Sequence, residues 1–331
     1  NGKIYGFVND VDNHFWHSRG VWLEKIGANR PPDTWDEVVE YSKKLKHVLP
    51  EGMYPLGFMM SRDMFGWESH WDVASAFGAN YFKPGTWEPT VDSPEAIKAA
   101  NFMRMLLEEE YLAPGSTTWD YARQLEAWND GKLAMCFQYP IQESYRPDMS
   151  VIAAEPKRWH SLAPRGLGPK GRHAMHATFT NVALGINKMS KNKEAAFIWG
   201  AFQTSTEVAY IYTIAGTGCD YGRKSIFENV YAGRFYPNTK ASLESFPYWY
   251  LPLQIAVAGE LREILVPAVH DVWTGRARAE EILPEANRKW HEVMEKYGYL
   301  RPGGPEPWPS FWQYDYPEEN KVTQELLKLY E

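Results

Sequence analysis

Residues 31–37 read Pro-Pro-Asp-Thr-Trp-Asp-Glu and mark the start of a helix more clearly than any other segment. Thr34 is a good N-cap residue, and Glu37 is placed to reach back to the Thr34 backbone N–H and complete a capping box. The prolines cannot extend a helix backwards, so they fix where it begins. Helical spacing then follows at Trp35, Val38, Val39, Ser42 and Leu45. The pattern predicts a helix over residues 34–47.

Further short strings stand in order on both sides of this helix. They are Asn1–Gly6, Leu23–Gly27, Val91–Ala96, Gly131–Met135, Ser190–Ala196 and Thr274–Arg276. Each alone is a cap or a turn, but the series resembles the extracellular solute-binding proteins of ABC importers, especially the sugar-binding family 1, the maltose-binding-protein-like group. The resemblance implies an α/β fold with a two-lobed, periplasmic-binding-protein-like (type II) architecture and a hinge between the lobes.

Strand-like apolar runs alternate with helical patterns, which predicts α/β layers with largely parallel strand pairing. We expect strands over 4–11, 55–60, 133–138 and 179–186, and helices over 16–26, 68–77, 121–129, 192–203, 251–273 and 280–297, with a further helix that Ser93 caps. The resemblance implies that 1–8 and 175–229 belong to the N-terminal lobe, and 9–174 and 230–331 to the C-terminal lobe. It further implies that the opening βα units of the N-terminal lobe, with an export signal, would precede Asn1.

Bulk composition excludes several classes of protein. The chain has 331 residues, of which 44% are hydrophobic, and a net charge of -7, which argues against nucleic acid or an anionic membrane as the main partner. No apolar run reaches the roughly 18 residues of a membrane span. The two cysteines, Cys136 and Cys219, exclude a disulfide framework and a cysteine-based metal motif. We expect no cofactor and no metal.

Aromatic residues are unusually abundant, with 15 Trp, 20 Tyr and 15 Phe. One interpretation is a large aromatic core. The other is a site that stacks on the flat apolar faces of sugars while polar groups at its edge bind their hydroxyls. The sequence leaves both open, residue by residue.

The resemblance nominates the site residues. Asp12, beside Asn9 after the first hinge strand, aligns with an acidic residue that accepts sugar hydroxyls, and Trp71, one turn after Trp67, aligns with a Trp near the ligand. The remaining candidates are Tyr139 as an aromatic platform, Asn181 facing the cleft, Arg223 in a ligand-facing loop, and Trp249 in an aromatic cluster that is either cleft wall or core. In this interpretation Trp71→Ala weakens sugar binding by more than about 1 kcal/mol without unfolding the protein.

The resemblance implies a substrate-binding component that is periplasmic or lipid-anchored at the cell surface. It captures a small-molecule carbohydrate and delivers it to the transmembrane subunits of an ABC permease. The alternatives are a binding protein for a polyol, phosphodiester or peptide, and a glycoside hydrolase. Residues 18–20, Ser-Arg-Gly, replace the family's Tyr-Asn-Lys and leave the sugar's identity open. Asn9–Asn13 lacks the Gly and Glu of a calcium loop, and Gly166–Gly171 lacks the strand and helix of a dinucleotide site.

Overall fold

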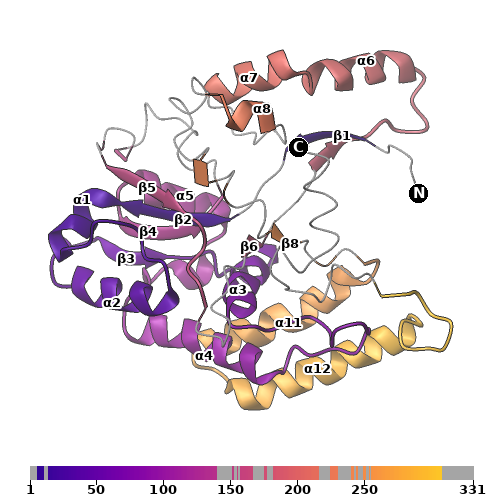
Figure 1. Cartoon of the computed structure of the whole chain (residues 1–331). Coiled ribbons are helices and arrows are strands. Elements are labelled where there is room, and N and C mark those ends of the chain that lie inside the picture. The colour runs from indigo at the N-terminus through magenta and orange to yellow at the C-terminus, as the bar shows by residue number, and fades with distance from the viewer. Residues whose placement is uncertain are drawn as a thin grey trace.

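Two groups of helices and strands make up the molecule, a larger one around a four-stranded sheet and a smaller one that holds β1, β7 and α6–α8 (Figure 1). A computed structural model describes residues 6–10, 14–139, 151–152, 155, 157–166, 175–176, 182–215, 224–229, 240–241, 244, 249–250, 253 and 255–307. The expected two-lobed α/β architecture is confirmed by structural relatives that are described below.

The sheet of the larger group has the strand order β3-β4-β2-β5. β3 (Tyr54–Gly57) and β4 (Leu133–Gln138) are parallel, whereas β2 (Phe15–Arg19) runs antiparallel to both β4 and β5 (Arg158–Ser161). The expectation of largely parallel pairing is therefore wrong for this sheet. β2 begins where β4 ends, opposite Gln138, so its direction is reversed.

Residues 16–19 were expected to begin a helix but lie in β2 instead, and only Gly20–Leu23 (α1) and Glu24–Ile26 (η1) of the expected helix are helical. Residues 16–19 are buried between two neighbouring strands. A short, fully buried segment has no amphipathic period by which a strand could be distinguished from a helix.

The helix that residues 31–37 predict is α2 (Trp35–Leu45). The Thr34 hydroxyl accepts a hydrogen bond from the Glu37 N–H at 3.2 Å. The Glu37 carboxylate reaches back to the backbone of Thr34 and also accepts from the Asp33 N–H at 2.6 Å. The Arg30 guanidinium holds the same carboxylate, and this hydrogen bond is the main cause of its lowered pKa. The local capping signal is thus confirmed.

The other helices of the larger group are α3 (Met64–Ala76), α4 (Pro94–Glu108), η2 (Ser116–Thr118), α5 (Tyr121–Asn129), α11 (Ala258–Trp273) and α12 (Ala279–Lys296). Ser93 caps α4 as expected, accepting from the Ala96 N–H at 3.2 Å. α3 begins four residues before the expected start, because Asp63 caps it by accepting from the Phe65 N–H.

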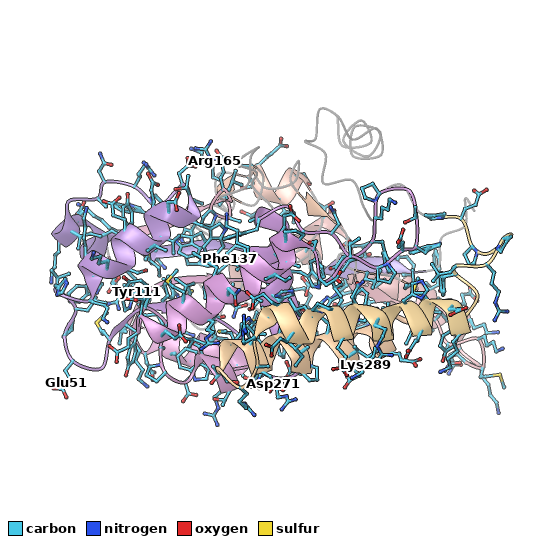
Figure 2. All side chains as sticks on the ribbon, turned by 90° about the horizontal axis from the view of Figure 1, so that it is seen from below. Glu51, Tyr111, Phe137, Arg165, Asp271 and Lys289 are labelled. Atoms are coloured by element: carbon cyan, nitrogen blue, oxygen red, sulfur yellow. The ribbon has the colours of Figure 1, made fainter. Side chains whose placement is uncertain are left out.

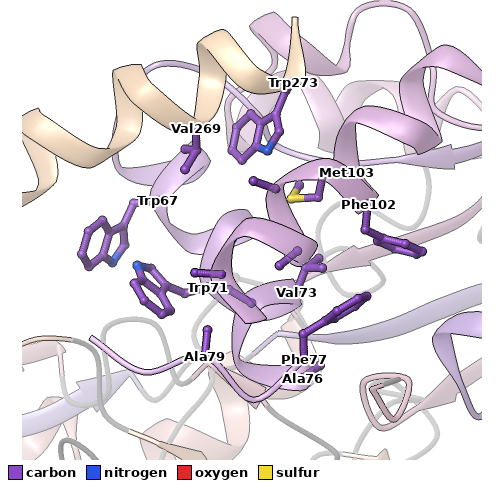
Figure 3. Packing of buried hydrophobic residues seen from close by; sticks show 14 of the residues in the cluster. Trp67, Trp71, Val73, Ala76, Phe77, Ala79, Phe102, Met103, Val269 and Trp273 are labelled. Atoms are coloured by element: carbon purple, nitrogen blue, oxygen red, sulfur yellow. The ribbon is translucent and has the colours of Figure 1, made fainter. Parts of the chain in front are cut away.

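The centre of the core is α3, whose residues from Gly66 to Ala76 are all buried. It packs against α4 and α11, and Figure 3 shows its large side chains interleaved with Phe102, Val269 and Trp273. Charged side chains such as Lys289 point outward while Phe137 lies inside (Figure 2). Cys136 is buried in the same sheet, and Cys219 lies outside the described residues.

The smaller group is built on a two-stranded antiparallel ribbon of β1 (Phe7–Asp10) and β7 (Val182–Leu184). It carries α6 (Lys193–Gln203), α7 (Thr206–Ala215) and α8 (Lys224–Phe227). A short parallel pair, β6 (Met175–His176) with β8 (Trp249–Tyr250), contacts α3 of the larger group through β6. The exact division of the chain between the lobes stays a prediction.

Candidate functional site

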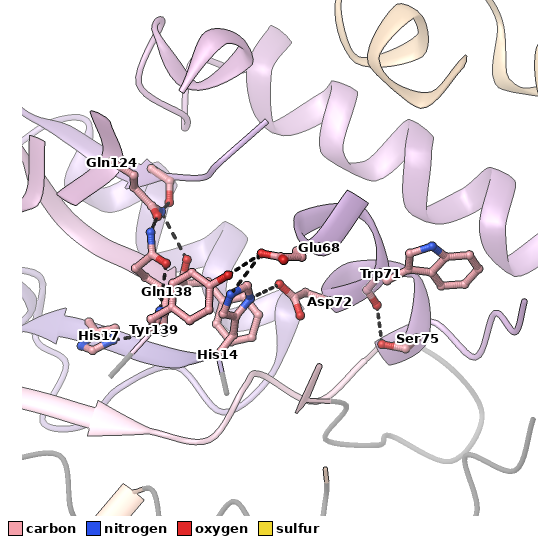
Figure 4. A network of polar contacts seen from close by, with 11 residues as sticks. His14, His17, Glu68, Trp71, Asp72, Ser75, Gln124, Gln138 and Tyr139 are labelled. Atoms are coloured by element: carbon pink, nitrogen blue, oxygen red, sulfur yellow. Dashed lines mark hydrogen bonds and ion pairs between the residues drawn. The ribbon is translucent and has the colours of Figure 1, made fainter. Parts of the chain in front are cut away.

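Four polar side chains converge where β2 starts, β4 ends and α3 passes (Figure 4). His14 directly precedes β2, and Tyr139 directly follows β4. Glu68 and Asp72 lie four residues apart on α3, and this spacing places them on one side of the helix. We call His14, Glu68, Asp72 and Tyr139 the carboxylate cluster.

The carboxylate cluster is held together by short contacts. Nδ1 of His14 lies 2.6 Å from Oδ2 of Asp72, and its Nε2 lies 3.7 Å from Oε2 of Glu68. The Tyr139 hydroxyl donates to the same Glu68 oxygen at 2.7 Å. None of the four residues is more than 5% exposed. One imidazole therefore joins two buried carboxylates, which is the kind of pairing that buried charge requires.

A pair of glutamines supports the cluster from the side of the sheet. The Gln124 side-chain amide of α5 donates to the carbonyl oxygens of Gly57 at 2.7 Å and Phe137 at 3.2 Å. The Gln138 amide donates to the Gln124 side-chain oxygen, and the Tyr139 N–H donates to Gln138 Oε1 at 2.9 Å. These bonds fix the end of β4 and so the position from which the Tyr139 ring extends.

Two further histidines lie on the sheet itself. Nδ1 of His17 is 3.1 Å from Nδ1 of His160, so one ring is the donor and the other the acceptor. Burial lowers the pKa of His17 to about 4 and that of His160 well below its usual value. Both rings are neutral at pH 7. Within the described part of the chain, no three His, Cys, Asp or Glu side chains are placed to hold a metal ion.

Trp67 and Trp71, two of the nominated site residues, lie in the aromatic core. Trp71 is fully buried with its ring centroid 4.0 Å from that of Tyr81, and Trp67 stacks on both Tyr81 and Trp290. The Trp71 ring has no exposed surface in this arrangement. The prediction that these two rings contact a ligand remains untested.

Of the other nominated residues, only Tyr139 belongs to the carboxylate cluster. Asn9 lies in β1, in the smaller group. Trp249 is in β8, where only its backbone is described. Asp12, Asn181 and Arg223 lie outside the described residues.

Sequence reasoning missed His14, Glu68 and Asp72 as a polar cluster. One signal was present in the sequence: two carboxylates four residues apart in a mostly apolar segment, Met64–Ala76. A carboxylate on a buried helix needs a partner, so this pair indicated a polar contact in the core.

The chain matches known proteins over most of its length. Residues 13–210, more than half of the chain, match the sequence model of the family described as bacterial extracellular solute-binding protein. The mannitol-binding protein of Pseudomonas aeruginosa is 23% identical over 327 residues, which cover 90% of this chain and 71% of that protein. A putative binding protein of Brucella abortus is 24% identical over 199 residues, or 59% of this chain and 45% of that protein.

Solved structures show the same fold. Maltose-bound MalE3 of T. maritima superposes with a TM-score of 0.80 at 24% identity, covering 88% of this chain and 73% of that one. A solute-binding protein of Agrobacterium vitis with bound D-mannitol gives 0.77 at 21% identity, covering 91% and 75%. No helix among the described residues combines the length and the apolar character that a membrane crossing requires.

Proposed function

The chain belongs to the bacterial extracellular solute-binding protein family, and from this premise we propose that it captures a sugar alcohol or sugar between its lobes for an ABC importer. Hinged closure supplies the mechanism, because a ligand that contacts both lobes selects the closed state. Closure then presents a new outer surface to the permease subunits. The protein acts outside the cytoplasm, in the periplasm or anchored at the cell surface, and the ligand leaves unaltered.

The observation that carries this proposal is the carboxylate cluster and its place in the chain. Only residues 11–13 separate β1 of the smaller group from His14, and so short a connection spans at most about 14 Å. The cluster therefore sits beside the crossing between the two groups. Burying carboxyl groups away from water is costly even when they have partners, so their presence here favours a binding role over a purely structural one.

The chemistry of the cluster favours a neutral ligand rich in hydroxyl groups. An ionised carboxylate only accepts hydrogen bonds, which suits the O–H donors of a polyol. A phosphodiester is disfavoured, because its negative charge would lie next to Glu68 and Asp72. Relatives whose structures contain mannitol, ribitol, tagatose and maltose support the same ligand class.

We assign Glu68 the contact with the ligand, and His14 and Tyr139 the positioning of its carboxylate. Glu68 is covered in this structure, with 2% of its surface exposed. Asp72, fixed by His14 at 2.6 Å, holds the imidazole in place.

A thermal-shift screen tests the proposal, because a ligand that binds only the folded protein stabilises it by about 2.7 kcal/mol at one hundred times its dissociation constant. Mannitol, ribitol, tagatose and maltose are each added to the 331-residue chain and to the protein purified from its source cells. We expect at least one to raise the midpoint, with calorimetry giving the affinity. Failure of all four, in both preparations, contradicts the proposal.

Glu68→Gln identifies the site. The substitution keeps the shape of the side chain but removes its charge and one acceptor oxygen, so we expect binding to weaken by about 1.5–3 kcal/mol. The matched control is Glu285→Gln on the outer face of α12, where the carboxylate is about half exposed and pairs with Lys289. Equal affinity in both variants would remove Glu68 from the site. A separate incubation of the protein with oligosaccharide distinguishes a binding protein, which leaves the oligosaccharide intact, from a glycoside hydrolase, which cleaves it.

A further inference from the structure

His17 and His160 face each other across two neighbouring strands of the four-stranded sheet. In the order β3-β4-β2-β5, the described part of β5 pairs with β2 alone, and the two histidines are direct partners in that pairing. Gly20, three residues after His17, donates its N–H to the Lys157 carbonyl oxygen at 2.8 Å. Hydrogen-bonded and non-hydrogen-bonded pairs alternate along an antiparallel ladder, so His17 and His160 form a non-hydrogen-bonded pair, whose side chains lie closer together.

The hydrogen bonds of this pair determine which ring nitrogen carries each proton. Nε2 of His17 lies 3.3 Å from the carbonyl oxygen of Gln138 (Figure 4). Because a carbonyl oxygen only accepts hydrogen bonds, this Nε2 is protonated. A neutral imidazole has a single N–H, so Nδ1 of His17 is the acceptor in the 3.1 Å contact with Nδ1 of His160. His160 is therefore the donor at neutral pH, through its Nδ1–H.

The surroundings of the pair do not favour a positive charge. His17 is fully buried, with its ring 5.8 Å from that of Trp128 on α5, whereas His160 is partly exposed and gives protons access to the pair. The titratable or charged groups that face the two rings from the described part of the chain are Cys136 on β4, Arg158 on β5, His14 before β2, and Arg19 on β2 with its partner Glu155. His14 and Arg158 both oppose a further positive charge on the pair.

Added protons weaken the contact in two steps. One proton can be shared, because His17 then donates from Nδ1 while His160 accepts in its other tautomer, but a positive charge is then held beside Arg158. A second proton leaves two N–H groups facing each other at 3.1 Å and places two like charges in contact.

The direction of the pH dependence follows from the two pKa values. Burial lowers the pKa of His17 from 6.5 to about 4 and that of His160 well below its usual value. Once β5 has opened, both rings are in water and bind protons near pH 6.5. The closed pairing is therefore fully stable above pH 6.5 and loses stability as the pH falls towards 4.

We propose that His17 and His160 form an acid-sensitive latch, which fastens β5 to β2 at neutral pH and releases β5 when both imidazoles bind protons. β5 is the strand that opens, because it has four residues at one end of the described sheet, whereas every residue of β4 in the interior is buried. Its release uncovers Gly20, where an added Cβ would lie 2.8 Å from the Trp159 ring. A member of an extracellular family is exposed to the pH of its surroundings, so the latch makes this edge of the sheet respond to that pH. This inference does not depend on the identity of the ligand.

Hydrogen exchange of the β5 amides tests the proposal. It is measured on the full chain from pH 7 to pH 5, and each rate is divided by the intrinsic exchange rate at that pH to give an opening constant. The informative amides are those of Trp159 and Ser161, which the alternation of the ladder places in hydrogen-bonded pairs. Uptake of two protons on opening should raise the opening constant roughly fiftyfold between pH 6 and pH 5, and uptake of one only roughly sevenfold. The amides of α12 should stay more strongly protected at every pH, because β5 opens while the core remains folded.

Two conservative substitutions keep the hydrogen bonds of the latch but cannot bind a proton. The amide of His160→Asn places a donor where Nδ1 of the imidazole lies, and that of His17→Gln places a donor where Nε2 lies. We expect His160→Asn to reduce the rise to roughly sevenfold and the double variant to abolish it. The matched control is His47→Asn, which replaces an exposed histidine and should leave the rise unchanged.

Three results overturn the proposal: a β5 opening constant that does not change between pH 6 and pH 5, an equal rise in the parent and the double variant, and β5 amides that open only together with those of α12. If the variants do not fold, a nitrogen NMR spectrum of the parent decides. At pH 7 it should show a protonated Nδ1 in His160 and a protonated Nε2 in His17. The opposite assignment in either ring contradicts the latch.

Discussion

Removing His14 and Asp72 singly and together measures whether the carboxylate cluster acts as one unit. The two side chains are joined by a 2.6 Å contact between Nδ1 and Oδ2, and neither is more than 1% exposed. A hydrogen bond to a charged group contributes about 1.5–3 kcal/mol, and breaking a buried ion pair from one side costs about 3–5 kcal/mol. We therefore expect His14→Ala and Asp72→Ala each to lower the free energy of unfolding by about 3 kcal/mol or more.

The double variant decides the question. Once one partner is gone, the second substitution no longer breaks this contact, so the double loss should fall short of the sum by about 1.5–3 kcal/mol. Urea unfolding followed by tryptophan fluorescence measures all four proteins, since Trp16, Trp35 and Trp71 are fully buried. Losses that add to within about 0.5 kcal/mol would refute the coupling. The same cycle on the half-exposed pair Glu40 and Lys44 should give only about 0.3–0.5 kcal/mol.

Three further substitutions test the core and its caps. Trp71→Ala should lower the free energy of unfolding by about 3–5 kcal/mol, measured in urea, because the ring is fully buried; a stable variant with lost affinity would instead support the ligand role that the sequence suggested. Burial lowers the pKa of His70 from 6.5 to about 3. Between these two values the unfolded chain binds a proton at His70 that the folded chain does not bind. The stability present above pH 6.5 is therefore lost as the pH falls towards 3. His70→Phe should therefore remove about 2 kcal/mol of the stability difference between pH 7 and pH 5, and an unchanged pH profile would contradict this. Thr34→Ala should cost about 1 kcal/mol through loss of the 3.2 Å cap to the Glu37 N–H, whereas a neutral result in the same urea assay would show that Asp33 and Arg30 suffice.

Local signals in the sequence predicted local structure well. The caps at Thr34 and Ser93 were recognised because a cap and the N–H it satisfies lie within three residues of each other. Strand pairing was predicted less well, since β2 pairs with β4 and β5 more than a hundred residues away. The direction of β2 depends on where its distant partner strands end. A short sequence pattern therefore cannot predict that direction.

The candidate site depends even more than the strand pairing on contacts between distant residues. His14, Glu68 and Tyr139 come from three segments, and each alone has an ordinary explanation as a loop histidine, a helix carboxylate or an aromatic residue. Their chemistry depends on the tertiary contacts that bring the histidine, the phenol and the two carboxylates together. The resemblance to a family supplied Tyr139 but not the other members of the cluster, because it compares positions one at a time.

The aromatic core and the carboxylate cluster share α3, and this explains why two interpretations of the same helix were both reasonable. Trp67 and Trp71 pack on Tyr81, while Glu68 and Asp72, one residue further on in each case, turn towards His14. A step of one residue rotates the side chain by about 100°, so one helix presents an apolar side to the core and an acidic side to the crossing between the lobes. Any movement of Glu68 towards a ligand must therefore displace the packing of Trp67 and Trp71. A close-packed core resists such displacement, so the proposed binding role of Glu68 requires that the carboxylate is held in place before a ligand arrives and that hinge closure provides the movement.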